Sequence, residues 1–279
     1  MFKKVPKKSA LEKEWEELRK KEENLLSARE KKKESKLNQF LAEKVPDKLQ
    51  GTLDLAFAKA FSLIFEKGTG VIEKTYKREI IEQEYKINEF TAEVKQNRKS
   101  LRKISKKASS AGTANLVISG TVGIGMGLVG VGIPDIPVFT SLVLKNIYEI
   151  ALNYGFGYET IQERYFVLRL IETAVSHGEQ MRELDHEINR FIAEETLPEG
   201  YRTNEQVKET AGSLSKELLY MKFLQGTPIV GTVGGAYDVI YMKQITEYSN
   251  LKYKHRFYEM KKGKIENIKD RNEWKILKK

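Results

Sequence analysis

Two aspartates, each beside a glycine-rich segment, are the residues of this chain best placed to do chemistry. Asp135 lies between two prolines at the end of the first segment, and Asp238 follows the second. A carboxylate there can cap the following helix by accepting hydrogen bonds from its free N–H groups. If both aspartates shared one pocket, they could instead act as general acid and base, with Arg164 and Arg169 as candidate partners. Capping is the simpler interpretation, so no residue is assigned a catalytic role.

Other reactive residue types are scarce. The chain has no cysteine, which excludes thiolate chemistry, and three histidines, at positions 177, 186 and 255. The histidines do not have the i, i+4 spacing of a helical metal site. The glycines after Thr121 lack the lysine and the acidic residue that accompany nucleotide-binding loops, and no serine lies in a nucleophile-elbow motif. We therefore predict no metal and no cofactor.

The glycine segments themselves need an explanation, because glycine destabilises a helix by about 1 kcal/mol relative to alanine. Residues 108–134 form one uncharged run, and residues 223–237 form a shorter one. Glycines four residues apart offer flat faces for close helix packing, whereas a long uncharged run can also insert into a bilayer. Both alternatives stay open from the sequence. The glycines assigned to helix packing or to the lining of an apolar site are Gly120, Gly123, Gly127, Gly130, Gly231 and Gly235.

Positive charge gathers just before the first glycine run and at the two chain ends, and the net charge is +10. The cluster before the run consists of Arg98, Lys99, Arg102, Lys103, Lys106 and Lys107. Lysine-rich clusters favour diffuse contact with anionic surfaces, such as phospholipid head groups, over the reading of nucleic-acid bases. We therefore expect an anionic membrane surface or lipid as the partner and no specific nucleic acid.

The elements that position these residues are predicted to be helices only. Apolar residues recur every three or four positions, and runs of period-two alternation are almost absent. Helices are predicted over about 47–67, 71–107, 139–154, 159–176, 179–195, 203–224 and from about 241 onward. The second helix is expected to bury Ile72, Tyr76, Ile80, Tyr85, Ile87, Phe90 and Val94. The predicted fold is an all-α multi-helix bundle with two glycine-rich helices or helical hairpins at its centre.

Three regions are expected along the chain. Residues 10–45 alternate charges densely, and residues 1–45 are predicted to form a charged helical arm, residues 46–262 the helical domain, and residues 263–279 a basic tail. The basic N-terminus leads into charged residues and not into an apolar stretch, which favours a cytoplasmic protein.

Several segments of the sequence resemble the EcsC family. They are GIGMGLVGVGIPDIP at 123–137, LKNIYEIALNYGF at 144–156, ERYFVLRLI at 163–171 and TPIVGTVGGAYD at 227–238. The resemblance covers roughly residues 49–262 and implies a bacterial protein whose eponymous relative is encoded beside an ABC transporter. It implies no molecular activity, because none is established for the family.

Charge and apolar runs together favour a non-enzymatic protein that binds lipid or associates peripherally with the inner face of the cell membrane. The alternative is an adaptor that binds a membrane-transport protein (a transporter) or a component of a secretion system. An uncharacterised enzyme that uses Asp135 and Asp238 ranks third, and nucleic-acid binding ranks last because no recognised module is present.

Overall fold

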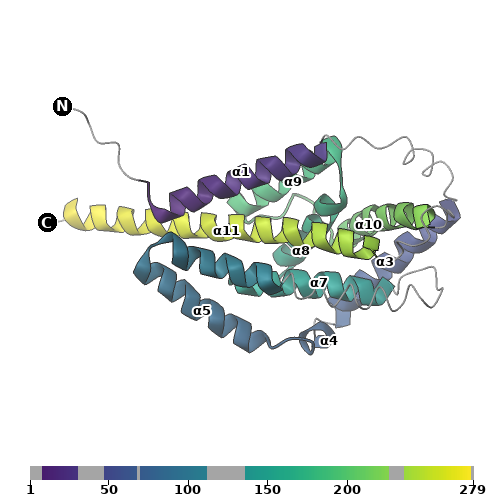
Figure 1. The fold of residues 1–279 in the computed structure, drawn as a ribbon, viewed down its shortest axis with the longest axis horizontal. Helices are drawn as coiled ribbons and strands as arrows, with labels where there is room; N and C mark the ends of the chain where they lie inside the picture. Colours follow the sequence, from purple (N-terminus) through teal and green to yellow (C-terminus); the bar gives the residue numbers. More distant parts are fainter. Residues whose placement is uncertain (1–7, 31–46, 68–69, 112–135, 226–235, 278–279) are drawn as a thin grey trace.

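The chain folds into a bundle of helices around one long C-terminal helix (Figure 1). The computed structural model describes residues 8–30, 47–67, 70–111, 136–225 and 236–277. Its helices are α1 (Ala10–Glu30), α3 (Asp47–Lys67), α4 (Gly70–Glu73), α5 (Arg78–Lys95), α7 (Ile136–Asn153), α8 (Ile161–Val175), α9 (Gly178–Glu194), α10 (Thr203–Gln225) and α11 (Ala236–Leu277). Residues 98–111 are also helical. No strand occurs among the described residues, so the predicted all-α class is confirmed.

The single helix predicted over 71–107 is wrong, because the chain breaks twice in that range. Residues 74–77 form a turn between α4 and α5. At the end of α5, Gln96 adopts a left-handed conformation (φ 43°), and its N–H bonds to the carbonyl of Ala92. A left-handed residue at this position ends a helix and redirects the chain. The basic residues 98–107 therefore belong to a separate helix.

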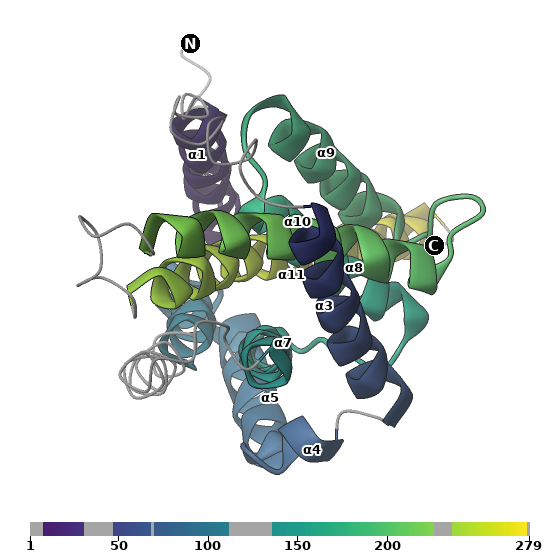
Figure 2. The same cartoon turned by 90° about the vertical axis from the view of Figure 1, so that its right-hand side faces the viewer.

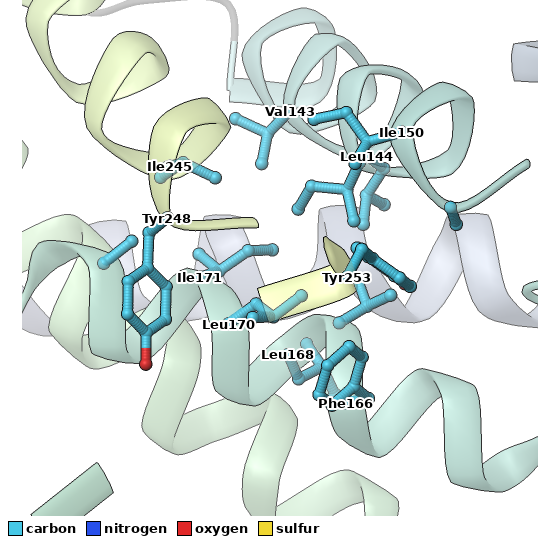
Figure 3. Packing of buried hydrophobic residues seen from close by; sticks show 14 of the residues in the cluster. Val143, Leu144, Ile150, Phe166, Leu168, Leu170, Ile171, Ile245, Tyr248 and Tyr253 are labelled. Atoms are coloured by element: carbon cyan, nitrogen blue, oxygen red, sulfur yellow. The ribbon is translucent and has the colours of Figure 1, made fainter. Parts of the chain in front are cut away.

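Helices α7, α8 and α11 supply the centre of the core. Figure 3 shows their side chains meeting between the three helices. The buried residues labelled there are Val143, Leu144 and Ile150 from α7, Phe166, Leu168, Leu170 and Ile171 from α8, and Ile245, Tyr248 and Tyr253 from α11. Burying one such side chain stabilises a fold by about 1.5–3 kcal/mol, so this cluster contributes substantially to stability.

Local sequence signals set the ends of the central helices. Thr160 caps α8 by accepting a hydrogen bond from the N–H of Glu163 at 3.1 Å. The turn after α7 uses Gly155 at φ +84°, a conformation that L residues rarely adopt. The ring of Tyr85 lies so close to Gly155 that an added Cβ would meet it at 2.2 Å. This glycine therefore allows both the turn and the close approach of α5.

The other helices surround this centre. Helices α1 and α9 pack against α11 on one side, and α5 and residues 98–111 lie on the opposite side (Figure 1). Helices α3 and α10 pack against each other at one end (Figure 2). Helix α5 lies at the edge of the bundle in both views, so one of its faces has no helix over it among those drawn as ribbons.

Candidate functional site

The outward face of α5 is apolar. Ile80, Ile87, Phe90 and Val94 are 48%, 64%, 67% and 65% exposed. At about 100° per residue these four side chains fall within about 80° of the helix circumference. We call this set the apolar stripe. Contiguous exposed apolar surface of this kind marks an interaction site more often than a random surface does.

The prediction that these four residues are buried is wrong, and the reason is visible on the opposite face of α5. There the helix packs through Ile81, Tyr85, Asn88 and Ala92, which are buried or partly buried. Tyr85 meets Phe257 of α11 edge to face, with ring centroids 6.5 Å apart. Helix α5 thus carries two apolar sides. The side that faces the core includes the polar groups of Tyr85 and Asn88, whereas the exposed side carries the four residues of the apolar stripe.

Charged contacts reinforce this orientation of α5. Lys261 of α11 is almost fully buried, and its Nζ lies 2.6 Å from Glu89 Oε1 and 2.7 Å from Glu93 Oε1. Burial raises the pKa of Glu89, but the hydrogen bond and charge of Lys261, with the charge of Lys264 and a hydrogen bond from Tyr85, together outweigh burial and leave that pKa below its usual value. The two glutamates therefore tie α5 to α11 from outside the apolar stripe.

The helix formed by residues 98–111 runs back alongside α5. Leu101, Ile104 and Ala108 are buried on its inner side. Lys107 Nζ lies 3.0 Å from Glu84 Oε2, an ion pair that joins this helix to α5. We call α5 and residues 98–111 together the α5 hairpin.

The structure divides the predicted basic cluster into two groups. Arg98 and Arg102 pair with Glu14 and Glu17 of α1, and Lys107 pairs with Glu84. The other three cations are exposed and form no ion pair with any residue that the structure describes. They are Lys99, Lys103 and Lys106, which we call the lysine row. The row lies within about 60° of the helix circumference, opposite the buried side of the same helix.

The α5 hairpin therefore presents an apolar stripe and a lysine row on adjacent helices. Both sets point away from the side chains that hold their helices to the bundle. Anionic groups can meet the lysines while apolar groups cover the stripe. The lysine row was part of the sequence prediction, whereas the exposed stripe was not.

A second group of polar residues lies buried between α1, α9 and α11. Lys252 Nζ lies 3.1 Å from Glu22 Oε1, 2.7 Å from Asp185 Oδ1 and 2.8 Å from Asn189 Oδ1. His255 Nδ1 lies 2.8 Å from Glu22 Oε1 and donates to it, since a carboxylate only accepts. Burial raises the pKa of Glu22, but His255 and Lys252 outweigh burial and lower it to about 2.

A third set joins α8 to α11. Glu163 accepts hydrogen bonds from Tyr253 at 2.5 Å and from Arg256 at 2.6 Å. Burial raises the pKa of Glu163 despite the opposing charge of Arg256. The Arg256 guanidinium also lies over the ring of Phe156, 4.4 Å from its centroid. Each buried charge here has a partner, as stable burial requires.

The two predicted arginines of a polar site lie in different surroundings. Arg169 of α8 contacts three carboxylates, at 2.9 Å from Glu172, 3.3 Å from Glu187 and 3.9 Å from Glu209. Burial raises the pKa of Glu172 to about 7, and the charge of Arg169 lowers it only in part. Arg164 lies over the ring of Phe65, 5.5 Å from its centroid.

The predicted aspartate pair and the glycine segments fall outside what the structure describes. Asp135 and the glycines at 120, 123, 127, 130, 231 and 235 are not among the described residues, and Asp238 lies in α11 without a described side chain. A shared site of the two aspartates, and glycine-rich helices at the centre, therefore stay predictions. Within the described ranges, no group of His, Asp and Glu side chains could hold a metal ion.

Comparison with models of known protein families identifies the family of this chain. A model of the EcsC protein family matches residues 10–257. The chain belongs to the EcsC protein family. Neither curated proteins nor solved structures gave a match. The family match begins within the first turn of α1, well before residue 49, where the resemblance in the sequence begins.

The family match thus includes a helix whose contribution sequence reasoning missed. In this EcsC-family chain, α1 brings Glu14 and Glu22 into buried positions, where their side chains are 1% and 4% exposed. One signal was present: both glutamates continue the three- and four-residue spacing of Leu11, Leu18 and Leu26. Among the helices described, none is both long and apolar enough to span a bilayer.

Proposed function

We propose that this protein binds the surface of anionic phospholipid membranes through the α5 hairpin and has no catalytic role. One observation carries the proposal: the apolar stripe is exposed on α5, and the lysine row is exposed on the helix that the Lys107–Glu84 ion pair joins to α5. An interfacial helix places its apolar side chains about 5–10 Å into the boundary between head groups and acyl chains, while nearby cations remain at the phosphates. The α5 hairpin has both parts.

Estimated energies support a reversible contact. Each lysine near an anionic surface contributes about 1 kcal/mol, so the lysine row contributes about 3 kcal/mol at moderate salt. Transfer of the four side chains of the apolar stripe from water adds a term proportional to the area removed from water. The first term weakens with salt and the second does not. Because anionic lipids are concentrated in the cytoplasmic leaflet, we place the protein in the cytoplasm, peripheral to the inner face of the membrane.

Vesicle co-sedimentation tests this proposal. The full chain is mixed with phosphatidylcholine vesicles that contain or lack phosphatidylglycerol, at 50 and 300 mM salt. We expect binding to the anionic vesicles that weakens with salt, and about tenfold or greater weakening in the variant K99Q/K103Q/K106Q at the lower salt. The variant I87Q/F90Q is expected to bind more weakly at both salt concentrations.

The control removes two exposed apolar residues elsewhere. Leu55 and Leu63 on α3 are 63% and 45% exposed, and the variant L55Q/L63Q should bind like the wild type. Absence of wild-type binding to anionic vesicles at the lower salt would end the membrane proposal. In that case the apolar stripe would fit the alternative of an adaptor that packs against a membrane-transport protein.

A further inference from the structure

We propose that α1 is an electrostatic latch on the membrane-binding surface: it occupies Arg98 and Arg102, and membrane phosphates compete with it for them. This inference rests on the proposed function. It concerns the regulation of the α5 hairpin, and its predicted result is a coupling between two events, the docking of α1 and binding to anionic lipid.

The contact between α1 and the α5 hairpin is made by two carboxylates and two guanidiniums. Glu14 Oε1 accepts a hydrogen bond from the Nε of Arg98 at 2.6 Å and from the Nε of Arg102 at 2.7 Å. Glu17 accepts hydrogen bonds from the Nη2 atoms of the same two arginines, and its distance to Nη2 of Arg102 is 2.7 Å. The four charges cancel, so while α1 is docked these arginines add nothing to the charge of the lysine row.

The two arginines directly adjoin the lysine row. Arg98 precedes Lys99 and Arg102 precedes Lys103 in the same helix. Their side chains are 35% and 52% exposed, so an anion at the surface can reach them. A guanidinium binds phosphate through the same paired hydrogen bonds that it makes to carboxylate, which makes a lipid phosphate a direct competitor of Glu14 and Glu17.

If Arg98 and Arg102 leave Glu14 to bind lipid phosphate, α1 has to move. The Glu14 side chain is 1% exposed, and its next cation is Lys254, with Nζ 4.0 Å away. A buried carboxylate without a close partner is strongly destabilising, so Glu14 has to reach water when its arginines bind phosphate. Reaching water requires the first turns of α1 to lift.

The remaining contacts of α1 allow such local movement. Three leucines and two glutamates are buried along its inner face, namely Leu11, Glu14, Leu18, Glu22 and Leu26, while Ala10, Trp15 and Leu25 are only partly buried. At the far end of α1, Arg29 donates to the carbonyl of Ala174 at 2.6 Å, and Arg182 pairs with Glu23 and Glu30. The N-terminal turns can therefore separate while the C-terminal turns stay attached.

Binding measurements on paired charge variants test the latch. The variant E14Q/E17Q frees both arginines and is expected to bind phosphatidylglycerol vesicles about tenfold more tightly than the wild type, with a steeper salt dependence. The control E23Q/E30Q changes the net charge equally and loosens the other end of α1, and it should match the wild type. Adding R98Q/R102Q to E14Q/E17Q should abolish the gain, while R98Q/R102Q alone should change wild-type binding little.

A spectroscopic readout follows α1 itself. Trp15 of α1 lies edge-on to His255, with ring centroids 4.8 Å apart, and beneath Lys262 Nζ at 3.2 Å. The chain has 2 tryptophans, so W274F leaves Trp15 as the only reporter. Anionic vesicles should shift its emission, and neutral vesicles should not. The latch would be overturned, and the proposed function left intact, if the wild type binds but shows no emission shift and E14Q/E17Q binds no more tightly. Absence of wild-type binding would overturn both.

Discussion

Removal of the buried carboxylate of Glu22 should destabilise the protein in a pH-dependent way. Glu22 faces Lys252 and His255 in the buried group between α1, α9 and α11. Burial opposes the charge on Glu22, yet these two partners outweigh burial and lower its pKa from 4.5 to about 2. The variant E22Q keeps the shape of the side chain and removes the charge.

The pKa values set the magnitude. A difference between 4.5 and about 2 corresponds to about 3 kcal/mol of stability at pH 7, at about 1.4 kcal/mol per unit. Because the pKa is lower in the folded state, the contribution is fully present above 4.5 and is lost as pH falls through about 2. The contribution of Glu22 to the free energy of unfolding should be about 1.4 kcal/mol at pH 3 and about 0.4 kcal/mol at pH 2.

Urea denaturation at pH 7 and pH 3 measures this difference. The free energy of unfolding of E22Q should fall below that of the wild type by about 3 kcal/mol at pH 7 and by about half of that at pH 3. The control E16Q changes a half-exposed carboxylate on the same helix, paired with Lys8, and should cost under about 1 kcal/mol at either pH. An equal loss for E22Q at both pH values would refute the electrostatic reasoning.

Two further predictions concern α8 and the turn after α7. Burial raises the pKa of Glu172 from 4.5 to about 7, so its ionised form destabilises the folded state. This destabilisation is complete above pH 7 and absent below about pH 4.5. The variant E172Q should therefore raise the melting temperature at pH 8 more than at pH 5, measured by circular dichroism. The variant G155A should lower the free energy of unfolding in urea by more than about 1 kcal/mol, because Gly155 has φ +84° and a Cβ would meet the Tyr85 ring. An unchanged midpoint for G155A would show that α5 can move away at no cost.

The periodicity of the sequence predicted helices well but could not orient them. Apolar residues spaced at 80, 87, 90 and 94 do form one side of α5, as the pattern indicates. The pattern says nothing about which side faces the core when a helix carries two apolar sides. Here the inner side is set by Tyr85 against Phe257 and by the bonds of Lys261, contacts that join residues more than 160 positions apart.

The buried charges escaped prediction for a similar reason. Glu14 and Glu22 look like solvated members of a charged helix, because the cations that neutralise them are distant in the sequence. Glu14 meets Arg98 across 84 residues, and Glu22 meets Lys252 across 230. The basic cluster at 98–107 could be predicted as a surface feature, but its division into paired arginines and unpaired lysines depends on where α1 lies.

Helix α11 links the two ends of the proposed mechanism. Through Lys252 and His255 it holds Glu22 of α1, and through Lys261 it holds Glu89 of α5. These contacts lie within about three turns of one helix, at about 1.5 Å rise per residue. The latch and the membrane-binding surface are therefore positioned by the same rigid element, so lifting of the first turns of α1 need not displace the apolar stripe. Exposure of Arg98 and Arg102 would then add charge to a surface that already has its final shape.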